Sequence, residues 1–344
     1  MKKTKKLLAC LIAAATMFTM GSTAFAADTG DKAQTPVDGK VQFTKEYKLI
    51  GEGESPAETF NFAIARGEVT DAAEGVTNEN MPLPEVGNVT YDGTNENDGL
   101  ATLKGNGKKV TVTLPKYESV GVYTYTITET TGKTAGVDYD TVPVTMKVTV
   151  INGEAKGTFK VESVSFTKGE KKLGEDEAAF NNTYTANKLE VSKEVKGNLG
   201  DKSKYFEFTI TLKGKDGATY NNDGYTVSGG SYDKNPTSIK VGESKTFKLK
   251  HGDTITIENL PKDVTYTVTE TAVDKYTTTV NETESNKATG KTTSDKATPA
   301  FVNTKGSEID TGVNLTTLPY ILVFAGVIVI AGAAFITRRR KFED

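Results

Sequence analysis

The sequence predicts an all-β protein built from two tandem immunoglobulin-like β-sandwich domains, with an N-terminal signal peptide and a C-terminal transmembrane helix. Three observations predict this. The central region is rich in Thr, Val, Tyr and Gly, in alternating runs with little helical periodicity. Several strand motifs occur twice in the same order, which indicates an internal repeat. Both ends of the chain differ from the centre in ways typical of targeting segments.

The N-terminal segment, residues 1–26, is typical of a secretory signal peptide. A basic stretch precedes the apolar residues 7–20, and Ala24-Phe25-Ala26 provides a small-residue cleavage site. We therefore expect the mature chain to begin after Ala26. Cys10 resembles the cysteine of a lipidation box, but the apolar run continues past it, which favours an ordinary cysteine within the signal.

The C-terminal segment predicts a membrane anchor. Residues 318–336 are nineteen uncharged residues, long enough for roughly 28 Å of helix, about the thickness of a hydrocarbon core. The tail, residues 337–344, begins with a basic cluster that is expected to stay in the cytoplasm.

Just before the anchor, residues 308–312 have the sequence Glu-Ile-Asp-Thr-Gly. A polar motif ending in Thr-Gly, an apolar span and a short basic tail together resemble the cell-wall sorting signal of Gram-positive surface proteins. The resemblance implies that a sortase cuts between Thr311 and Gly312 and passes the Thr311 carbonyl to an amine. The commonest motif of that family is Leu-Pro-x-Thr-Gly. Asp310 without a preceding Pro departs from it and leaves the sortase class open, and a plain single-span anchor is the alternative.

The charge of the mature region excludes some partners. Without the eight basic and two acidic residues of the two ends, 34 basic and 43 acidic residues remain, a net charge of −9. This balance argues against binding to nucleic acid or to an anionic membrane surface. The mature region has no Cys, so an exported chain of this kind cannot be held by disulfides.

The repeated motifs place the first domain at residues 37–185 and the second at residues 188–305. Each domain is long enough to bury its own core, and the spacing of short strands suits a β-sandwich. The matched pairs are Phe60-x-Phe62 with Phe206-x-Phe208, residues 107–115 with 252–261, Tyr-Thr-Ile-Thr-Glu-Thr with Tyr-Thr-Val-Thr-Glu-Thr, and Phe180-Asn-Asn182 with Phe301-Val-Asn303.

Residues 78–99 lack periodicity and are rich in Asn, Gly, Glu and Pro, so we expect a long surface insertion there. Its acidic and amide side chains could bind calcium, but their spacing is not that of an EF-hand loop, and a solvated loop is the favoured interpretation. The side chains concerned are Asp92, Asn95, Glu96 and Asp98. No metal and no cofactor is predicted for the chain.

Three polar residues fall in phase with the apolar side of predicted strands, and the same triple occurs in both domains. The first triple is Lys45, Glu129 and Asn182, and the second is Lys193, Glu270 and Asn303. Because strand side chains alternate between two faces, all six are expected to point inward. Inward Lys and Glu are rare unless they meet a partner, so we expect the members of each triple to meet.

Such a site favours an amide exchange. Desolvation lowers the pKa of the amine and raises that of the carboxyl group, so both tend to be neutral. A neutral amine is a nucleophile, and a protonated Glu can stabilise the oxyanion and carry a proton to the leaving ammonia. The expected products are isopeptide bonds from Lys45 to Asn182 and from Lys193 to Asn303. The alternative is a buried, hydrogen-bonded ion pair without a bond.

These motifs resemble the intramolecular isopeptide domains of streptococcal T-antigen-type backbone pilins, and collagen-adhesin B-type repeats use similar chemistry. The resemblance covers nearly the whole mature chain and implies that Glu129 and Glu270 are the catalytic acids. Asn181 competes with Asn182, but the phase with Phe180 and the match to Asn303 favour Asn182. Each bond is expected to join the first strand of a domain to its last, so that tension bypasses the sandwich.

The resemblance implies a structural subunit of a covalently polymerised, wall-anchored pilus shaft. Its implied partners are a sortase, other copies of itself, minor or tip pilins, peptidoglycan and a host surface ligand. The acceptor lysine of polymerisation is expected in a Gly- and Lys-rich loop before the Asn182 strand, where the candidates are Lys172, Lys171 and Lys168. The alternative is a monomeric wall-anchored adhesin stalk or a minor pilin. A turnover enzyme is disfavoured, because His251 is the only His and the mature chain has no Cys.

Overall fold

The computed structural model describes residues 32–93 and 107–306. These residues form strands and no helix, so the prediction of an all-β protein is confirmed. The predicted signal peptide, sorting motif, transmembrane segment and cytoplasmic tail lie outside the described residues. No helix within the described ranges is long and apolar enough to cross a membrane.

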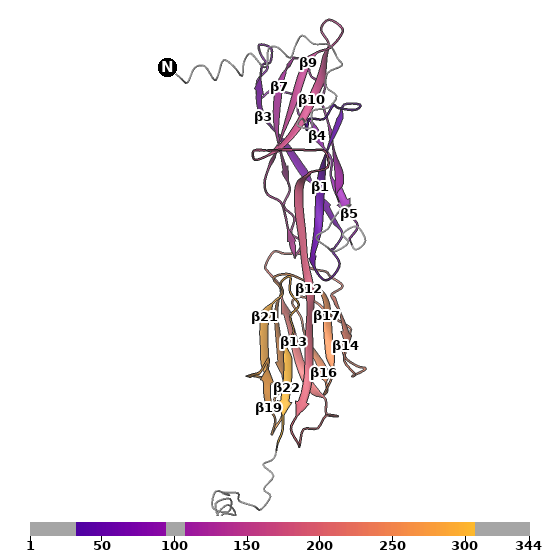
Figure 1. Cartoon of the computed structure of the whole chain (residues 1–344), viewed down its shortest axis with the longest axis vertical. Helices are drawn as coiled ribbons and strands as arrows, with labels where there is room; N and C mark the ends of the chain where they lie inside the picture. Colours follow the sequence, from indigo (N-terminus) through magenta and orange to yellow (C-terminus); the bar gives the residue numbers. More distant parts are fainter. Residues whose placement is uncertain (1–31, 94–106, 307–344) are drawn as a thin grey trace, which may run out of the picture.

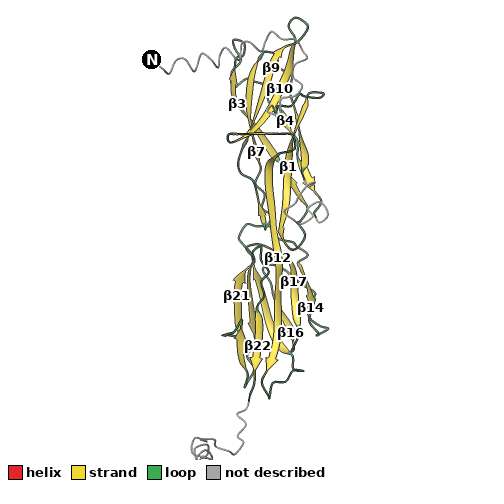
Figure 2. Cartoon of the chain, in the orientation of Figure 1, coloured by secondary structure: helices red, strands yellow, loops and turns green. Residues whose placement is uncertain are grey.

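The strands build two sandwiches placed end to end along one axis (Figures 1 and 2). The strands of the first sandwich are β1 (Lys40–Gly51), β2 (Glu58–Phe60), β3 (Phe62–Thr70), β4 (Glu85–Val86), β5 (Val89–Tyr91), β6 (Lys108–Thr113), β7 (Gly121–Glu129), β8 (Val137–Asp138), β9 (Val144–Asn152), β10 (Phe159–Lys168) and β11 (Lys171–Leu173). Strand β12 (Ala178–Lys196) belongs to both sandwiches. Those of the second are β13 (Phe206–Lys213), β14 (Tyr225–Gly229), β15 (Ser238–Ile239), β16 (Ser244–Leu249), β17 (Thr254–Pro261), β18 (Thr265–Glu270), β19 (Thr277–Val280), β20 (Thr283–Glu284), β21 (Lys287–Lys291) and β22 (Ala300–Thr304).

Each sandwich has two main layers around its own core. In the first, β8, β12, β1, β6 and β4 face the sheet β11-β10-β9-β7-β3, while β2 and β5 pair separately. In the second, β15, β14, β17, β12, β22, β19 and β20 face the sheet β16-β13-β18-β21. Because β12 lies in one layer of each sandwich, those two layers form a single eleven-stranded sheet.

Strand β12 is 19 residues long and runs without interruption through both sandwiches (Figure 1). Its first half pairs in parallel with β1, and its second half pairs in parallel with β22 and antiparallel with β17. The boundary predicted between residues 185 and 188 therefore lies inside a strand. The last strand of the first sandwich continues directly as the first strand of the second.

Contacts beside β12 close the joint between the sandwiches. Thr219 donates its N–H to the carbonyl of Lys133 at 2.7 Å, and Ala135 returns an N–H to the Thr219 carbonyl at 2.9 Å. The Lys262 ammonium forms an ion pair with Asp138 across the same junction. The two sandwiches are thus joined by backbone pairing as well as by the continuous strand.

The segment predicted as a surface insertion, residues 78–99, differs from the prediction where the structure describes it. It contains β4 and β5, and the side chains of Met81 and Tyr91 are fully buried in the first core. Single apolar residues in a segment without periodicity gave no pattern from which this packing could be predicted. Of the four calcium candidates only Asp92 is described, and the described residues hold no cluster of His, Cys, Asp and Glu suited to a metal.

Gly51 at the end of β1 allows this tight joint. Its φ is +91°, and a Cβ there would lie 2.1 Å from the carbonyl oxygen of Ala186, which is itself paired with Pro261 of the second sandwich. We expect Gly51→Ala to loosen the joint and to speed amide hydrogen exchange at residues 185–188 by about tenfold or more. Gly75→Ala is the matched control, because Gly75 has φ +90° but no atom within 4 Å of the position that a Cβ would take. Equal exchange in both variants would contradict the role of this contact.

Candidate functional site

Strand register brings each predicted triple together. In the first sandwich Lys45 and Asn182 come from the parallel neighbours β1 and β12, where Lys45 pairs with Phe180 and Tyr47 pairs with Asn182. Glu129 reaches them from β7 in the facing sheet. The Lys and the Asn are thus diagonal neighbours on one sheet, and the Glu closes the site from the other side of the core.

The second sandwich repeats this register. Lys193 of β12 pairs with Phe301, and Val195 pairs with Asn303 of β22. Glu270 comes from β18 in the facing sheet. Because the offset between the Lys and the Asn is the same in both domains, the two sites are built by one arrangement of three strands.

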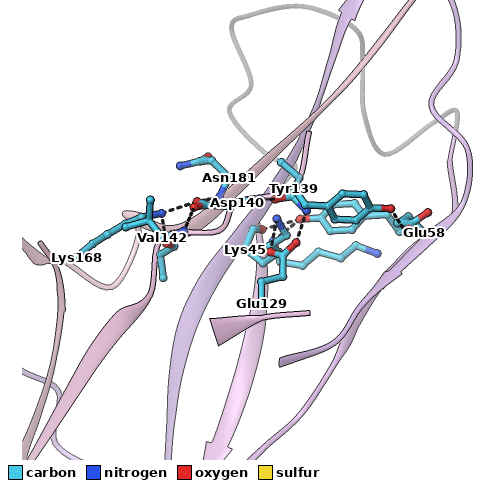
Figure 3. Close-up of polar contacts among 12 residues, drawn as sticks. Lys45, Glu58, Glu129, Tyr139, Asp140, Val142, Lys168 and Asn181 are labelled. Atoms are coloured by element: carbon cyan, nitrogen blue, oxygen red, sulfur yellow. Dashed lines mark hydrogen bonds and ion pairs between the residues drawn. The ribbon is translucent and has the colours of Figure 1, made fainter. Parts of the chain in front are cut away.

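In the first site the carboxyl group of Glu129 lies between the amine and the amide. Lys45 Nζ is 3.0 Å from Glu129 Oε2, and Asn182 Nδ2 donates a hydrogen bond to Glu129 Oε1. Asn182 Oδ1 accepts a hydrogen bond of 2.8 Å from the backbone N–H of Asp140. Figure 3 shows Lys45 and Glu129 facing one another, with Asp140 on the adjoining segment.

In the second site the same carboxyl geometry recurs. Lys193 Nζ donates to Glu270 Oε2 at 3.1 Å, and Asn303 Nδ2 donates to Glu270 Oε1. Asn303 Oδ1, however, is buried without a hydrogen-bond partner among the described residues. In the first site Lys45 Nζ and Glu129 Oε2 lie within ion-pair distance but not in hydrogen-bond geometry. The two sites therefore share the contacts of the carboxyl group, and they differ in the geometry at the amine and in the donor to the amide oxygen.

Both sites are buried and lie against aromatic rings. The side chains of both lysines are 0% exposed, and those of Glu129 and Glu270 are 0% and 1% exposed. Lys45 Nζ lies 4.4 Å from the ring centroid of Phe60, and Lys193 Nζ lies 4.5 Å from that of Phe206. The repeated Phe motif of the sequence thus forms the same wall in each site.

This environment shifts the pKa values of the lysine and the glutamate in each site toward their neutral forms. Burial lowers the pKa of Lys45 and that of Lys193 from 10.5 to about 8, although the facing Glu opposes the shift. Burial also raises the pKa of Glu129 and that of Glu270 above 4.5, against the opposing effect of the lysines. A proton can therefore be shared within each pair, and the amine has access to its nucleophilic form.

The structure separates the two candidate asparagines. Asn182 is fully buried in the site, whereas Asn181 is exposed and contacts Asp140 through its backbone N–H at 2.9 Å. Only Asn182 places its carboxamide beside Lys45 and Glu129.

The three lysine candidates for polymerisation lie in a hairpin rather than a loop. Lys168 ends β10, while Lys171 and Lys172 begin β11, with a two-residue turn between them. Lys168 forms an ion pair with Asp140 and donates to the Ala179 carbonyl at 2.9 Å. Lys171 projects with a side chain 66% exposed and lies 3.1 Å from Glu177. The three candidates therefore differ in their access to solvent.

Comparisons with known proteins match both domains of the chain. Residues 41–185 match the family described as Spy0128-like isopeptide containing domain, and residues 187–305 match a domain of unknown function, DUF7601. The chain is 31% identical over 345 residues to a pilin of Streptococcus pyogenes serotype M1, covering 93% of this chain and 96% of that protein. It belongs to this pilin family.

Two further similarities agree with the assignment. The crystal structure of the major pilin from Streptococcus pyogenes superposes with a TM-score of 0.51 at 27% identity, covering 79% of this pilin and all of that chain. The pilus tip adhesin Cpa of Streptococcus pyogenes is 37% identical over 128 residues, which is 36% of this pilin and 18% of the adhesin. Homology to major pilins supports a pilus shaft subunit, exposed at the cell surface and assembled with other pilins.

Sequence reasoning identified six of the polar groups in the two sites and missed a seventh, the backbone N–H of Asp140. This residue lies two positions past β8 in a segment with no strand of its own. No side-chain pattern marks a backbone donor, so only the fold reveals it.

Mass provides a direct test of the chemistry that the sites permit. Each Lys–Asn bond releases one ammonia, so residues 27–311 are expected to be about 34 Da lighter than their sequence mass. Glu129→Ala and Glu270→Ala are each expected to restore about 17 Da, because each carboxyl group serves only its own site. Asn181→Ala is the matched control and is expected to keep the full deficit. An intact-mass spectrum without any deficit would leave the triples as ion pairs.

Proposed function

We propose that this pilin is a wall-anchored subunit of a covalently polymerised pilus shaft, in which each domain closes itself with one Lys–Asn isopeptide bond. The observation that carries the proposal is the recurrence of one geometry. In both domains a buried carboxyl group contacts the lysine amine through one oxygen and the asparagine amide through the other. The cross-linking is a single turnover, so the protein is a structural subunit and not an enzyme.

The two carboxyl oxygens provide a path for the proton. Transfer from the lysine ammonium to the carboxylate leaves a neutral amine and a carboxylic acid, and the amine nitrogen then attacks the asparagine Cγ. Oε2 accepts a proton from the attacking nitrogen, while Oε1 donates one to Nδ2. The Cγ–Nδ2 bond breaks, ammonia leaves, and an amide joins the two side chains. Held in contact, the groups react without the entropic cost of an encounter.

Each bond closes a long segment of chain. The pairs are separated by 137 residues in the first domain and by 110 residues in the second. Loop-closure entropy suggests a stabilisation on the order of 4–5 kcal/mol for each, if the relation used for disulfides applies. The bonds thus replace the disulfides that a chain without mature Cys cannot form.

Protease resistance is expected to follow the bonds domain by domain. Asn303→Ala removes the second bond, so β22 can separate from β12 and expose cleavable backbone. We expect trypsin to cut the second domain of this variant at least about tenfold faster, while the first domain survives. Asn182→Ala is the reciprocal variant and is expected to show the reverse pattern. Equal resistance of both variants and the parent would show that the bonds do not protect the fold.

For the polymerisation acceptor we favour the β10–β11 hairpin, and within it Lys171 and Lys172. Lys168 is held by the ion pair with Asp140 and has a side chain only 21% exposed, which keeps its amine from an acyl-enzyme. Lys171 is far more exposed, and Lys172 is half-buried beside it on the same short strand. A sortase is proposed to join the Thr311 carbonyl of one subunit to this hairpin in the next, and to attach the last subunit to peptidoglycan.

Replacement of both lysines tests this assignment. We expect Lys171→Arg with Lys172→Arg to abolish the high-mass ladder in wall extracts, because Arg keeps the charge but is a poor nucleophile. Both internal bonds and the wall-anchored monomer should remain. Lys160→Arg is the control, since Lys160 is an exposed, ion-paired lysine at the other end of β10. A persisting ladder would move the acceptor elsewhere.

The alternative is a monomeric adhesin stalk or a minor pilin. The similarity of part of the chain to a pilus tip adhesin favours this possibility. It predicts a single wall-anchored band in the parent strain, where the shaft predicts a ladder.

A further inference from the structure

We propose that the backbone N–H of Asp140 stabilises the oxyanion in the cross-linking reaction of the first domain, and that the second domain lacks such a donor. The Lys45–Asn182 bond then forms faster than the Lys193–Asn303 bond. This inference rests on the proposed isopeptide chemistry and adds a catalytic group to it.

The position of the donor fits the charge that develops. When the lysine nitrogen attacks Cγ of Asn182, the negative charge builds on Oδ1. The Asp140 N–H donates to this atom over 2.8 Å, within the range at which backbone donors stabilise an oxyanion. Glu129 contacts the other atom of the amide, Nδ2, so the leaving group and the oxyanion are held by different partners.

The side chain of Asp140 fixes the direction of its own N–H. One carboxylate oxygen accepts the Val142 N–H at 3.1 Å, and the other accepts the Asn181 N–H at 2.9 Å. The second oxygen also forms the ion pair with Lys168. Figure 3 shows this cluster beside the Lys45 site. Three contacts to a side chain that is 9% exposed hold residue 140 in one orientation. The Asp140 carboxylate and Lys168 are therefore positioning groups.

The fold explains why the first site has room for this donor. Strand β8 pairs with β12 at only two positions, Asp138 with Thr183 and Val137 with Tyr184. Beyond Asp138 the segment leaves the ladder. The carboxylate of Asp140 then accepts the backbone N–H of Asn181, and the Asp140 N–H is available to the asparagine side chain.

In the second domain the equivalent edge is a regular ladder. Strand β19 pairs with β22 at four consecutive positions, including Thr278 with Asn303 and Thr279 with Val302. Strand β19 is paired with β22 on one side and with β20 on the other, and Asn303 Oδ1 has no hydrogen-bond partner among the described residues. A buried oxygen without a donor carries the developing charge at a higher cost.

The proposal can be tested by measuring the rates at which the two bonds form in the same molecules. Residues 27–311 are synthesised in a cell-free system, quenched in acid denaturant at intervals, digested, and analysed for each cross-linked peptide. In the parent we expect the first bond to form about tenfold or more faster than the second. In a chain with the α-hydroxy analogue of Asp at position 140, an ester oxygen replaces only the N–H. The first bond should then form about a hundredfold more slowly, while the second bond should form at the same rate as in the parent.

Side-chain variants separate positioning from folding. Asp140→Ala removes the acceptors that orient the N–H and is expected to slow the first bond about tenfold, whereas Asp140→Asn keeps an acceptor and should retain most of the rate. Protection of the β9 amides from hydrogen exchange reports that the first domain of each variant has folded, and the second bond, formed at the parent rate, reports the same for the second domain. An ester chain whose first bond forms at the parent rate would overturn this inference and leave the proposed function intact. A parent with no mass loss in either domain would overturn the proposed function itself.

Discussion

In each of the two sandwiches, the structure depends on an amine and a carboxyl group that lie together in a buried aromatic core. Each buried charge would cost several kcal/mol without its partner, so the strands that carry them are stable only in the register that brings them into contact. That register places Lys45 beside Glu129 and Lys193 beside Glu270. A buried ion pair is a weak source of stability, whereas an amide carries no charge. Conversion to an isopeptide bond would therefore remove the desolvation cost of the charged amine, which is the cost that shifts the pKa values of the unreacted groups toward their neutral forms.

How much of this could be predicted from sequence depends on the kind of signal. Period two placed Lys45, Glu129 and Asn182 on the inward face, because one inward polar residue in an otherwise apolar series is conspicuous. The same parity favoured Asn182 over Asn181, and the structure buries the first and exposes the second. By contrast, no pattern of alternating side chains indicated that β12 continues across the joint. Residues 184–187 are buried in succession, since both faces of the strand are covered there and alternation is lost.

Other features escaped prediction because they are not side-chain patterns. Met81 and Tyr91 fill the first core from a segment that has no periodicity, and their burial comes from the path of the backbone alone. Asp140 contributes an N–H whose direction depends on three contacts to residues that are distant or adjacent in sequence. Lys168 looked like a free surface lysine until the fold paired it with Asp140. In each case the missing information was tertiary.

The continuous strand also changes how load would pass through a shaft. If subunits join through Lys171 or Lys172, tension enters just before β12, runs along that strand from Asn182 to Lys193, crosses to Asn303 and leaves at Thr311. The proposed second bond would lie on this path and bypass the rest of its domain. The proposed first bond would lie beside the path, where it would tie β12 to β1 and resist the peeling of one strand from the other. The two bonds would then share one chemistry but act differently, the second as a link in the load path and the first as an anchor for the strand that carries the load.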